Sequence, residues 1–305
     1  MIRVAVIGTG AMGQHHIKTL SQLEGVYLVA VADPVAPPPG CLPPHTLHFD
    51  SLDTLLTEVA VDAVCITAPT SHHHALATMA LSHHLDVLIE KPITSTPDQA
   101  HELIALAQQY NRLIQVGHIE RFNPAVIQLL THYQSGAWGE ARLIQTHRMS
   151  PRPTRITDAN VMIDLAVHDL EVIRSIMGME PQAVHSIAHA SDQYTLDTGI
   201  ITLTYPHCVA SVTVSWASPL RARQLSMITS QGLVSLDYRD QTLDWTAYDG
   251  ITQHIPVTPE PPLMGEWRHF LSCIQTRQSP CVDGYAGLSA LQWATTMPNI
   301  PTTPS

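Results

Sequence analysis

In the first 120 residues, apolar positions gather in short, almost continuous runs separated by longer segments of mixed polarity. Five runs have the length of strands buried on both faces of a sheet: residues 3–7, 27–32, 62–67, 86–90 and 113–116. Three segments between them have the length and composition of helices: residues 51–58, 71–83 and 96–110. Strands and helices that alternate at this spacing predict an α/β domain with a doubly wound parallel sheet of the Rossmann type.

The pattern changes at about residue 142. A helix is predicted over residues 161–177, where apolar residues recur along one face. Beyond this helix, strand-like runs joined by turn residues cover residues 183–190, 195–205, 209–216, 224–230, 233–238 and 242–247. Because successive runs are joined by short turns, they predict a largely antiparallel open sheet, and helices are expected afterwards over 263–277 and 284–296. This part of the chain is therefore expected to be an α+β domain.

These patterns predict a Rossmann domain over residues 1–119, an α+β domain over 120–297 and an unstructured tail over 298–305. Segment 34–44 contains six prolines in eleven positions, so the crossover helix usual at this point should be shortened or replaced by a loop. Ser71 is expected to cap the helix over 71–83. One face of the open sheet should be free for a second subunit, which predicts a homodimer or homotetramer.

The composition narrows the class of protein. The chain is 45% hydrophobic and 13% charged, which is typical of a globular protein with a large core. Its net charge of -11 gives no general attraction to nucleic acid or to an anionic membrane surface, so a small molecule is the expected partner. No apolar stretch reaches the ~18 to 20 residues that a membrane span requires. Five scattered cysteines without Cys-x-x-Cys spacing indicate reduced thiols. Because the first strand begins at once and leaves no room for a signal peptide, we expect a cytoplasmic protein.

Nineteen histidines, some in clusters such as residues 72–74, raise the question of a metal centre. None has a cysteine or glutamate partner at zinc-enzyme spacing, and adjacent histidines on a helix diverge. We therefore predict no metal site and interpret the clusters as solvent-facing helix positions, with some nucleotide contacts.

The first strand leads into a glycine-rich turn that is typical of dinucleotide binding. Gly8 allows a tight turn, Gly10 lets a pyrophosphate approach the backbone, and Gly13 lets the next helix pack against the sheet. Asp33 lies twenty residues beyond Gly13, where a carboxylate binds ribose hydroxyls and repels a 2′-phosphate, so NAD is favoured over NADP. Ligands of such sheets bind at the carboxyl ends of the strands. The predicted cofactor-binding residues are Gly8, Gly10, Ala11, Met12, Gly13, Asp33, Ala68, Thr70, His72, Glu90 and Lys91.

Glu90-Lys91-Pro92 stands at the end of a buried strand, beside the expected position of the nicotinamide. A partly desolvated Lys91 ammonium would favour an alkoxide on a substrate hydroxyl, and Glu90 could pair with it. The alternative is a surface lysine whose stem alone is buried.

Asp164 and His168 are four residues apart in the helix over 161–177 and should share one face. A neutral imidazole is suited to accept the proton of a hydroxyl, and a carboxylate one turn away can orient it. The alternative is an ordinary helix pair. The co-occurrence with Lys91 favours catalysis, with Lys91, His168 and Asp164 as the predicted catalytic residues.

Further substrate contacts are predicted between these motifs. Arg121 and Asn123 follow the last Rossmann strand and should flank an interdomain cleft. Arg148, Arg152 and Arg155 are three arginines in eight residues, a concentration of bidentate donors that suits phosphates. The alternative for the arginines is a solvated basic loop. The predicted substrate-binding residues are Arg121, Asn123, Arg148, Arg152, Arg155, Asp164 and His168.

The dinucleotide turn, Glu90-Lys91-Pro92 and Asp164-x-x-x-His168-Asp169, in this order, resemble the Gfo/Idh/MocA family of NAD(P)-dependent sugar and cyclitol oxidoreductases. Within that family, the stretches 117–124 and 155–169 are similar to those of UDP-N-acetylglucosamine 3-dehydrogenases. The resemblance implies that Lys91 and His168 form the catalytic pair and that Asp164 contacts or orients the substrate.

The expected function is NAD-dependent oxidation of a ring hydroxyl in a sugar, at carbon 3 of a UDP-N-acetylhexosamine. One alternative is a dehydrogenase of a free cyclitol or sugar such as inositol. An alternative of another class is a non-catalytic, NAD-sensing binding protein, since one fold hosts many functions.

Overall fold

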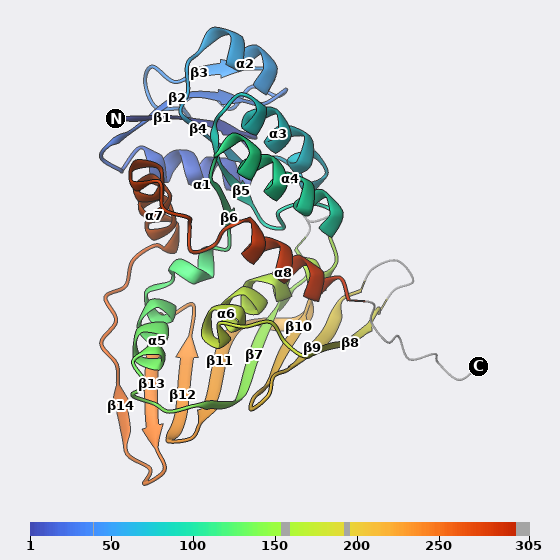
Figure 1. The fold of residues 1–305 in the computed structure, drawn as a ribbon, viewed down its shortest axis with the longest axis vertical. Coiled ribbons are helices and arrows are strands. Elements are labelled where there is room, and N and C mark those ends of the chain that lie inside the picture. Colours follow the sequence, from blue (N-terminus) through green and yellow to red (C-terminus); the bar gives the residue numbers. More distant parts are fainter. Residues whose placement is uncertain (39, 154–158, 192–195, 297–305) are drawn as a thin grey trace, which may run out of the picture. The chain divides into compact units, whose positions relative to one another are not determined.

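The computed structural model describes residues 1–38, 40–153, 159–191 and 196–296. The chain forms two compact units (Figure 1). The first contains residues 1–118 and 263–288, and the second contains residues 119–262 and the described residues from 289 onward.

The first unit is built on a six-stranded parallel sheet in the order β3-β2-β1-β4-β5-β6. Its strands are β1 (Ile2–Ile7), β2 (Val26–Ala32), β3 (Leu47–Phe49), β4 (Ala63–Ile66), β5 (Asp86–Glu90) and β6 (Ile114–Gly117). The connecting helices are α1 (Ala11–Leu20), α2 (Leu52–Glu58), α3 (Thr70–Ser82) and α4 (Pro97–Tyr110). All residues of β4 and β5 are buried, which explains the apolar sequence of β4 and of the three central residues of β5. The strand order is that of a doubly wound dinucleotide-binding fold, as the sequence predicts.

The ends of α4 follow from its sequence. The Thr96 hydroxyl accepts a hydrogen bond from the Gln99 amide at 3.4 Å, Pro97 occupies the first turn, and Asn111 ends the helix at φ 52°. The predicted cap of α3 is wrong, because that helix begins at Thr70 behind Pro69 and has no side-chain cap. Ser71 is its second residue.

The described residues of the proline-rich segment form no helix between β2 and β3, in agreement with the prediction of a loop. The short strand β3, which pairs in parallel with β2 at the edge of the sheet, was not expected from the sequence. Its three residues give too short an apolar signal to be recognised.

The second unit contains an eight-stranded sheet in the order β14-β13-β12-β11-β7-β10-β9-β8. The strands are β7 (Ala141–Pro151), β8 (Ala183–His189), β9 (Thr198–Thr204), β10 (Val209–Ser215), β11 (Ala217–Thr229), β12 (Gly232–Asp237), β13 (Thr242–Ala247) and β14 (Thr252–His254). The pairing is antiparallel except between β7 and β10, which confirms the predicted sheet. Residues 148–151 belong to β7, so the interpretation of this stretch as a basic loop is wrong.

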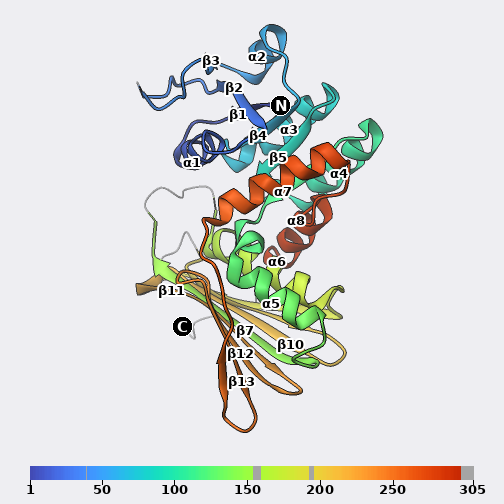
Figure 2. The same ribbon diagram turned by 90° about the vertical axis from the view of Figure 1, so that its left-hand side faces the viewer.

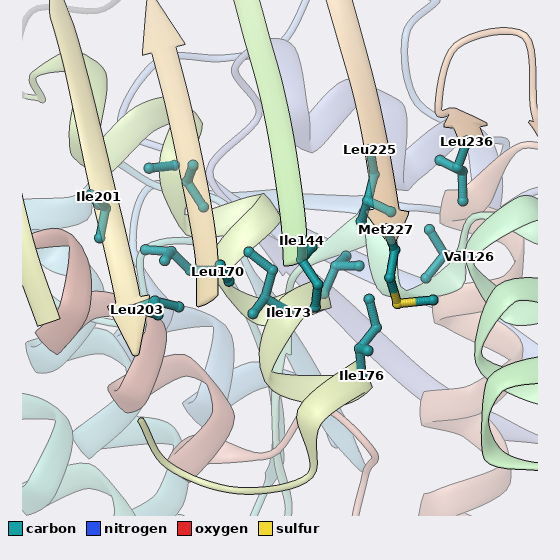
Figure 3. Packing of buried hydrophobic residues seen from close by; sticks show 14 of the residues in the cluster. Val126, Ile144, Leu170, Ile173, Ile176, Ile201, Leu203, Leu225, Met227 and Leu236 are labelled. Atoms are coloured by element: carbon teal, nitrogen blue, oxygen red, sulfur yellow. The ribbon is translucent and has the colours of Figure 1, made fainter. Parts of the chain in front are cut away.

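Helices cover one face of this sheet (Figure 2). They are the 3-10 helix η1 (Ile119–Phe122), α5 (Pro124–Gln134), the π-helical segment η2 (Met162–Ala166) and α6 (Val167–Met177). Side chains of α5 and α6, among them Val126, Leu170 and Ile173, pack on Ile144 and Met227 of the sheet (Figure 3). Burial of this apolar face fixes the segment that carries Asp164 and His168 against a rigid sheet.

The helix α7 (Pro262–Thr276) and the first residues of α8 (Gly284–Ala294) belong to the first unit, whereas the sequence assigns residues 263–288 to the second domain. Side chains of the Rossmann sheet hold α7 directly. Gln115 donates to the Glu266 carbonyl at 3.1 Å, and Arg277 forms an ion pair with Asp86 at 2.6 Å. Trp267 is fully buried there. The α-helical C-terminal segment therefore completes the Rossmann unit.

Within the described part of the chain, every helix is too short or too polar to cross a lipid bilayer.

Candidate active site and cofactor-binding site

The glycine-rich turn between β1 and α1 has the geometry of a dinucleotide-binding turn. Gly8 has a φ of 97°, and a Cβ there would lie 2.7 Å from the Ala68 amide nitrogen. A Cβ on Gly13 would overlap the Gly8 carbonyl oxygen. A Cβ on Gly10, by contrast, would meet no protein atom within 4 Å. Protein packing thus explains Gly8 and Gly13, whereas the open space at Gly10 fits a pyrophosphate on the helix N-terminus.

Asp33 follows β2 directly and is bound to the glycine-rich turn. Its Oδ2 accepts hydrogen bonds from the amide and hydroxyl of Thr9 at 2.7 and 3.0 Å, and its Oδ1 accepts from the Val35 amide at 2.8 Å. Burial raises the pKa of Asp33, but these hydrogen bonds outweigh burial and leave the pKa below its usual value. The carboxylate is therefore ionised at neutral pH, as recognition of ribose hydroxyls requires.

The loop after β4 contributes the next predicted contacts. Ala68 and Thr70 are half-buried at this edge of the sheet, and His72 is exposed. The neighbouring His73 is buried, with Nε2 2.9 Å from the Ala68 carbonyl oxygen and Nδ1 2.9 Å from that of Pro92. His73, which the sequence analysis did not single out, therefore connects the loop after β4 with the Lys91 segment.

A surface cavity of about 710 Å³ lies along α1, lined by residues that include Ala11, Lys18, Cys41 and Pro43. The proline-rich segment thus forms one wall of a cavity that begins at the dinucleotide turn.

The last residue of β5, Glu90, is 8% exposed and engages a buried histidine. Its Oε1 lies 3.0 Å from His16 Nε2, and its Oε2 accepts from the Lys91 amide at 3.2 Å. Burial raises the pKa of Glu90, but the His16 hydrogen bond and the nearby Lys91 charge bring it below its usual value. Lys91 itself is half-buried at the rim of the sheet. A buried anion therefore stands directly behind the predicted catalytic lysine.

In the second unit, Asp164 and His168 lie where a π-helical turn passes into α6. Asn160 caps this segment, with Oδ1 accepting from the amides of Met162 and Ile163 at 3.0 and 3.1 Å. Both Asp164 and His168 are half-buried, so each keeps some access to solvent. The expected regular α-helix is replaced by a π-turn, a local distortion that is frequent at functional sites.

Arg148 has a structural role that the sequence analysis did not predict. Its guanidinium is 2% exposed and donates to Asp169 at 2.8 and 3.2 Å and to Glu120 at 2.9 Å. This ion-pair network joins β7, η1 and α6, directly beside His168. Because its donors are occupied and buried, Arg148 is not a phosphate ligand, which corrects the expectation of a clamp made of three arginines.

Asn123 is corrected in the same way. It is 1% exposed, its Oδ1 caps α5 by accepting from the Ala125 amide at 3.1 Å, and its Nδ2 donates to the Tyr238 carbonyl at 2.9 Å. Asparagine is a preferred N-cap residue, so this position serves the fold. Arg121, in η1, is half-buried.

Of the other predicted phosphate ligands, Arg152 is exposed, with its guanidinium carbon 5.9 Å from the centre of the Trp216 ring. Arg155 lies outside the described residues, as does the predicted tail over 298–305. The sequence analysis missed Arg223, whose side chain is 44% exposed and lies 3.6 Å from Glu120. Arg221 lies two residues before it in β11, a pairing of arginines that the sequence analysis did not use. Among the described residues, no group of three or more histidine, cysteine or acidic side chains is placed to hold a metal ion.

Comparisons with known proteins agree with this geometry. The family profile "Oxidoreductase family, NAD-binding Rossmann fold" matches residues 2–118, and the Gfo/Idh/MocA C-terminal domain matches residues 126–235. The chain is 31% identical to UDP-N-acetylglucosamine 3-dehydrogenase of Acidithiobacillus ferrooxidans over 95% of this chain and 94% of the relative. A crystal structure of that enzyme has a TM-score of 0.87 at 29% identity and covers 96% of this chain and 95% of its own.

A second group of relatives acts on cyclitols. Inositol 2-dehydrogenase 1 of Saccharopolyspora erythraea is 31% identical over 59% of this chain and 55% of its own length. The two family profiles and the relative that matches along nearly its whole length agree on the family. These matches also confirm the prediction that the protein is an NAD-binding enzyme and not a non-catalytic binding protein. The chain belongs to the Gfo/Idh/MocA family of oxidoreductases, whose N-terminal domain is an NAD-binding Rossmann fold.

Proposed function

We propose that this protein is an NAD-dependent dehydrogenase that oxidises carbon 3 of the hexosamine ring in a UDP-N-acetylhexosamine. One observation carries the proposal: the similarity to a UDP-N-acetylglucosamine 3-dehydrogenase extends over 95% of the chain. The alignment with the inositol dehydrogenase covers only 59% of the chain. A match along nearly the whole chain includes the C-terminal domain, so it is more informative about the substrate than a match over 59% of the chain.

In the proposed reaction, His168 accepts the proton of the hydroxyl, and the Lys91 ammonium stabilises the alkoxide that forms. Asp164 orients the substrate or the imidazole and stabilises the protonated ring. When bound, NAD supplies the hydride acceptor for the hydrogen on the same ring carbon, so the alcohol loses one proton and one hydride to become a ketone. The open space at Gly10 and the ionised Asp33 support cofactor binding in the first unit.

The preference for NAD over NADP rests on Asp33. Its carboxylate is anchored by Thr9 and Val35, and an ionised group there repels a 2′-phosphate. Arg152 and Arg155 are the remaining candidates, among the arginines predicted from the sequence, to bind the diphosphate of the substrate. The partly exposed Arg223 is a third candidate.

A homo-oligomer formed through the open sheet also belongs to the proposal. Uncovered apolar residues on β8 to β12 support it: Ile187, Ile200, Val209, Ile228 and Leu233 are each 38% to 56% exposed. All five cysteines are free thiols, which supports the expected cytoplasmic location.

The test is a mass-spectrometric screen of the purified protein with NAD and, separately, UDP-N-acetylglucosamine, UDP-glucose and myo-inositol. Hydroxylamine in each reaction traps a ketone that an unfavourable equilibrium would otherwise hide. A ketone product confined to the UDP-N-acetylhexosamine, with reduced cofactor, is the expected result.

The second candidate is a dehydrogenase of a free cyclitol, which the inositol dehydrogenases among the relatives favour. Turnover of myo-inositol alone would establish that candidate and would remove the arginines from the substrate site. Absence of turnover with all three compounds would contradict both.

A further inference from the structure

A chain of buried polar side chains lies behind Lys91 in the first unit, and the proposed reaction does not use it. His16, in α1, is completely buried and has three polar neighbours. Its Nε2 lies 3.0 Å from Glu90 Oε1, its Nδ1 accepts from the Trp267 indole at 3.0 Å, and Cys65 Sγ lies 3.4 Å from the same Nδ1. Both ring nitrogens are therefore engaged.

These contacts fix the tautomer of His16. The indole nitrogen of Trp267 can only donate, so His16 Nδ1 must present its lone pair. The single proton of the neutral ring is then on Nε2, where it is donated to the Glu90 carboxylate. Trp267 thus sets the direction of these hydrogen bonds, from its indole to the His16 imidazole and from there to the Glu90 carboxylate.

The negative charge of the cluster lies on Glu90. A second buried carboxyl group, Glu266, is fully enclosed, and neither of its side-chain oxygens has a hydrogen-bond partner among the described residues. Burial and the neighbouring Glu90 raise the pKa of Glu266 well above its usual value, so it is neutral. Glu90, which has donors from His16 and from the Lys91 amide, is the ionised member.

We propose that His16, oriented by Trp267, is a positioning residue that holds the Glu90 carboxylate and thereby fixes Lys91 for catalysis. The link to Lys91 has two parts: the hydrogen bond from the Lys91 amide to Glu90 Oε2, and the attraction between the two opposite charges. The inference rests on the proposed function, because it takes Lys91 as the catalytic lysine. It adds a group that never touches the substrate and acts through Glu90.

Two substitutions separate this role from plain packing. In His16→Gln, the side-chain amide nitrogen can take the place of Nε2 and still donate to Glu90. In His16→Asn, the shorter side chain reaches only the position of Nδ1, where its oxygen can accept from Trp267 but nothing donates to Glu90. His16→Asn removes one methylene more than His16→Gln from this buried site, so the Tm of each variant is needed to record the packing defect separately from the lost hydrogen bond.

The measurements are kcat, KM, the Kd of NAD and the Tm for each variant. Loss of a hydrogen bond to a charged group predicts a kcat about tenfold lower in His16→Asn. The Kd of NAD should change by less than about twofold, because the dinucleotide turn is untouched, and His16→Gln should restore most of kcat. Equal kcat in the two variants, whatever their Tm, would overturn the inference and leave His16 a packing residue.

Two further measurements keep the inference separate from the proposed function. The variant Lys91→Met is assayed alongside. Full activity of Lys91→Met would contradict the catalytic role proposed for Lys91. A strong loss of kcat in Lys91→Met together with a normal kcat in His16→Asn would reject only the positioning role of His16. Nitrogen-15 NMR of labelled histidine, assigned with His16→Gln, reads the tautomer without any substrate. A proton on Nε2 of His16 is expected, and a proton on Nδ1 would contradict the chain of hydrogen bonds from Trp267.

Discussion

Replacement of Arg148 by methionine distinguishes two roles for this residue: an ion pair that stabilises the fold, or a ligand for the phosphates of the substrate. The change keeps an unbranched apolar stem of similar bulk but removes the guanidinium between Asp169 and Glu120. Both carboxylates are buried, at 1% and 5% exposure, and would lose this cation, with only the longer 3.6 Å contact to Arg223 left for Glu120. Such a variant should lose stability even when no substrate is present.

The size of the effect follows from the geometry. Arg148 makes three hydrogen bonds of 2.8 to 3.2 Å to two buried carboxylates, and solvent screens none of them appreciably. Removing one partner of a buried ion pair costs about 3–5 kcal/mol in the free energy of unfolding. At about 2–4 °C per kcal/mol, the Tm should fall by roughly 10 °C. The total stability of a typical domain exceeds this loss, so the variant should still fold.

Thermal unfolding followed by circular dichroism measures the loss, with Arg152→Met as the matched control. Arg152 is exposed and lies over Trp216, so its replacement should change the Tm by less than about 2 °C. The triple variant Arg148→Met, Asp169→Asn, Glu120→Gln should recover part of the loss, because the two buried negative charges are gone. A normal Tm with weaker binding of the UDP-sugar in Arg148→Met would refute the argument and return Arg148 to the substrate site.

Three other expectations concern the active site and its surroundings. Lys91→Met and His168→Asn should each lower kcat by roughly 10²-fold or more with an unchanged Kd of NAD, measured by steady-state assay and by titration. Asp33→Ser should raise the ratio of kcat/KM with NADP to that with NAD, and an unchanged ratio would assign the selectivity to the proline-rich segment instead. Because burial raises the pKa of Glu266, the folded chain keeps a proton that the unfolded chain releases above its usual pKa of 4.5, so this group makes the protein less stable as the pH rises. Glu266→Gln should therefore gain stability over the parent protein as the pH increases from about 5 to 8, measured by urea unfolding, and a constant difference would mean that Glu266 is ionised.

The Rossmann unit was predictable because its signals are local. A strand such as β4 is buried on both faces and is therefore apolar along its whole length. Gly13 is required by its contact with the Gly8 carbonyl oxygen within the same turn, and the positive φ of Gly8 is a property of that residue alone. The C-terminal sheet was also recognisable, because each short turn marks the end of one strand.

The roles of Arg148 and Asn123 were harder to predict from the sequence, because they depend on contacts with residues far along the chain. Arg148 looks the same in sequence as Arg152, yet its partners Asp169 and Glu120 are 21 and 28 residues away. Asn123 follows the pattern of an N-cap before Pro124, a signal that was available but was read as a substrate contact. The assignment of α7 to the first unit depends on Gln115 and Asp86, which lie 151 and 191 residues before their partners Glu266 and Arg277. No local pattern contains that information.

The histidine clusters show how structure divides residues that the sequence treats alike. His15 is exposed and His16 is buried; His72 is exposed and His73 is buried, because neighbours on a helix point in different directions. The two buried members contact one segment: His16 binds the carboxylate of Glu90, and His73 binds the carbonyl oxygen of Pro92. Lys91 stands between these two anchors, so the residues on either side of it are tied to different helices, Glu90 to α1 through its carboxylate and Pro92 to α3 through its carbonyl oxygen. A surface lysine that only interacts with solvent does not require such anchoring. For a catalytic lysine, the ammonium must be positioned within a few tenths of an ångström of the reacting oxygen, and the reaction would be slower without the anchors.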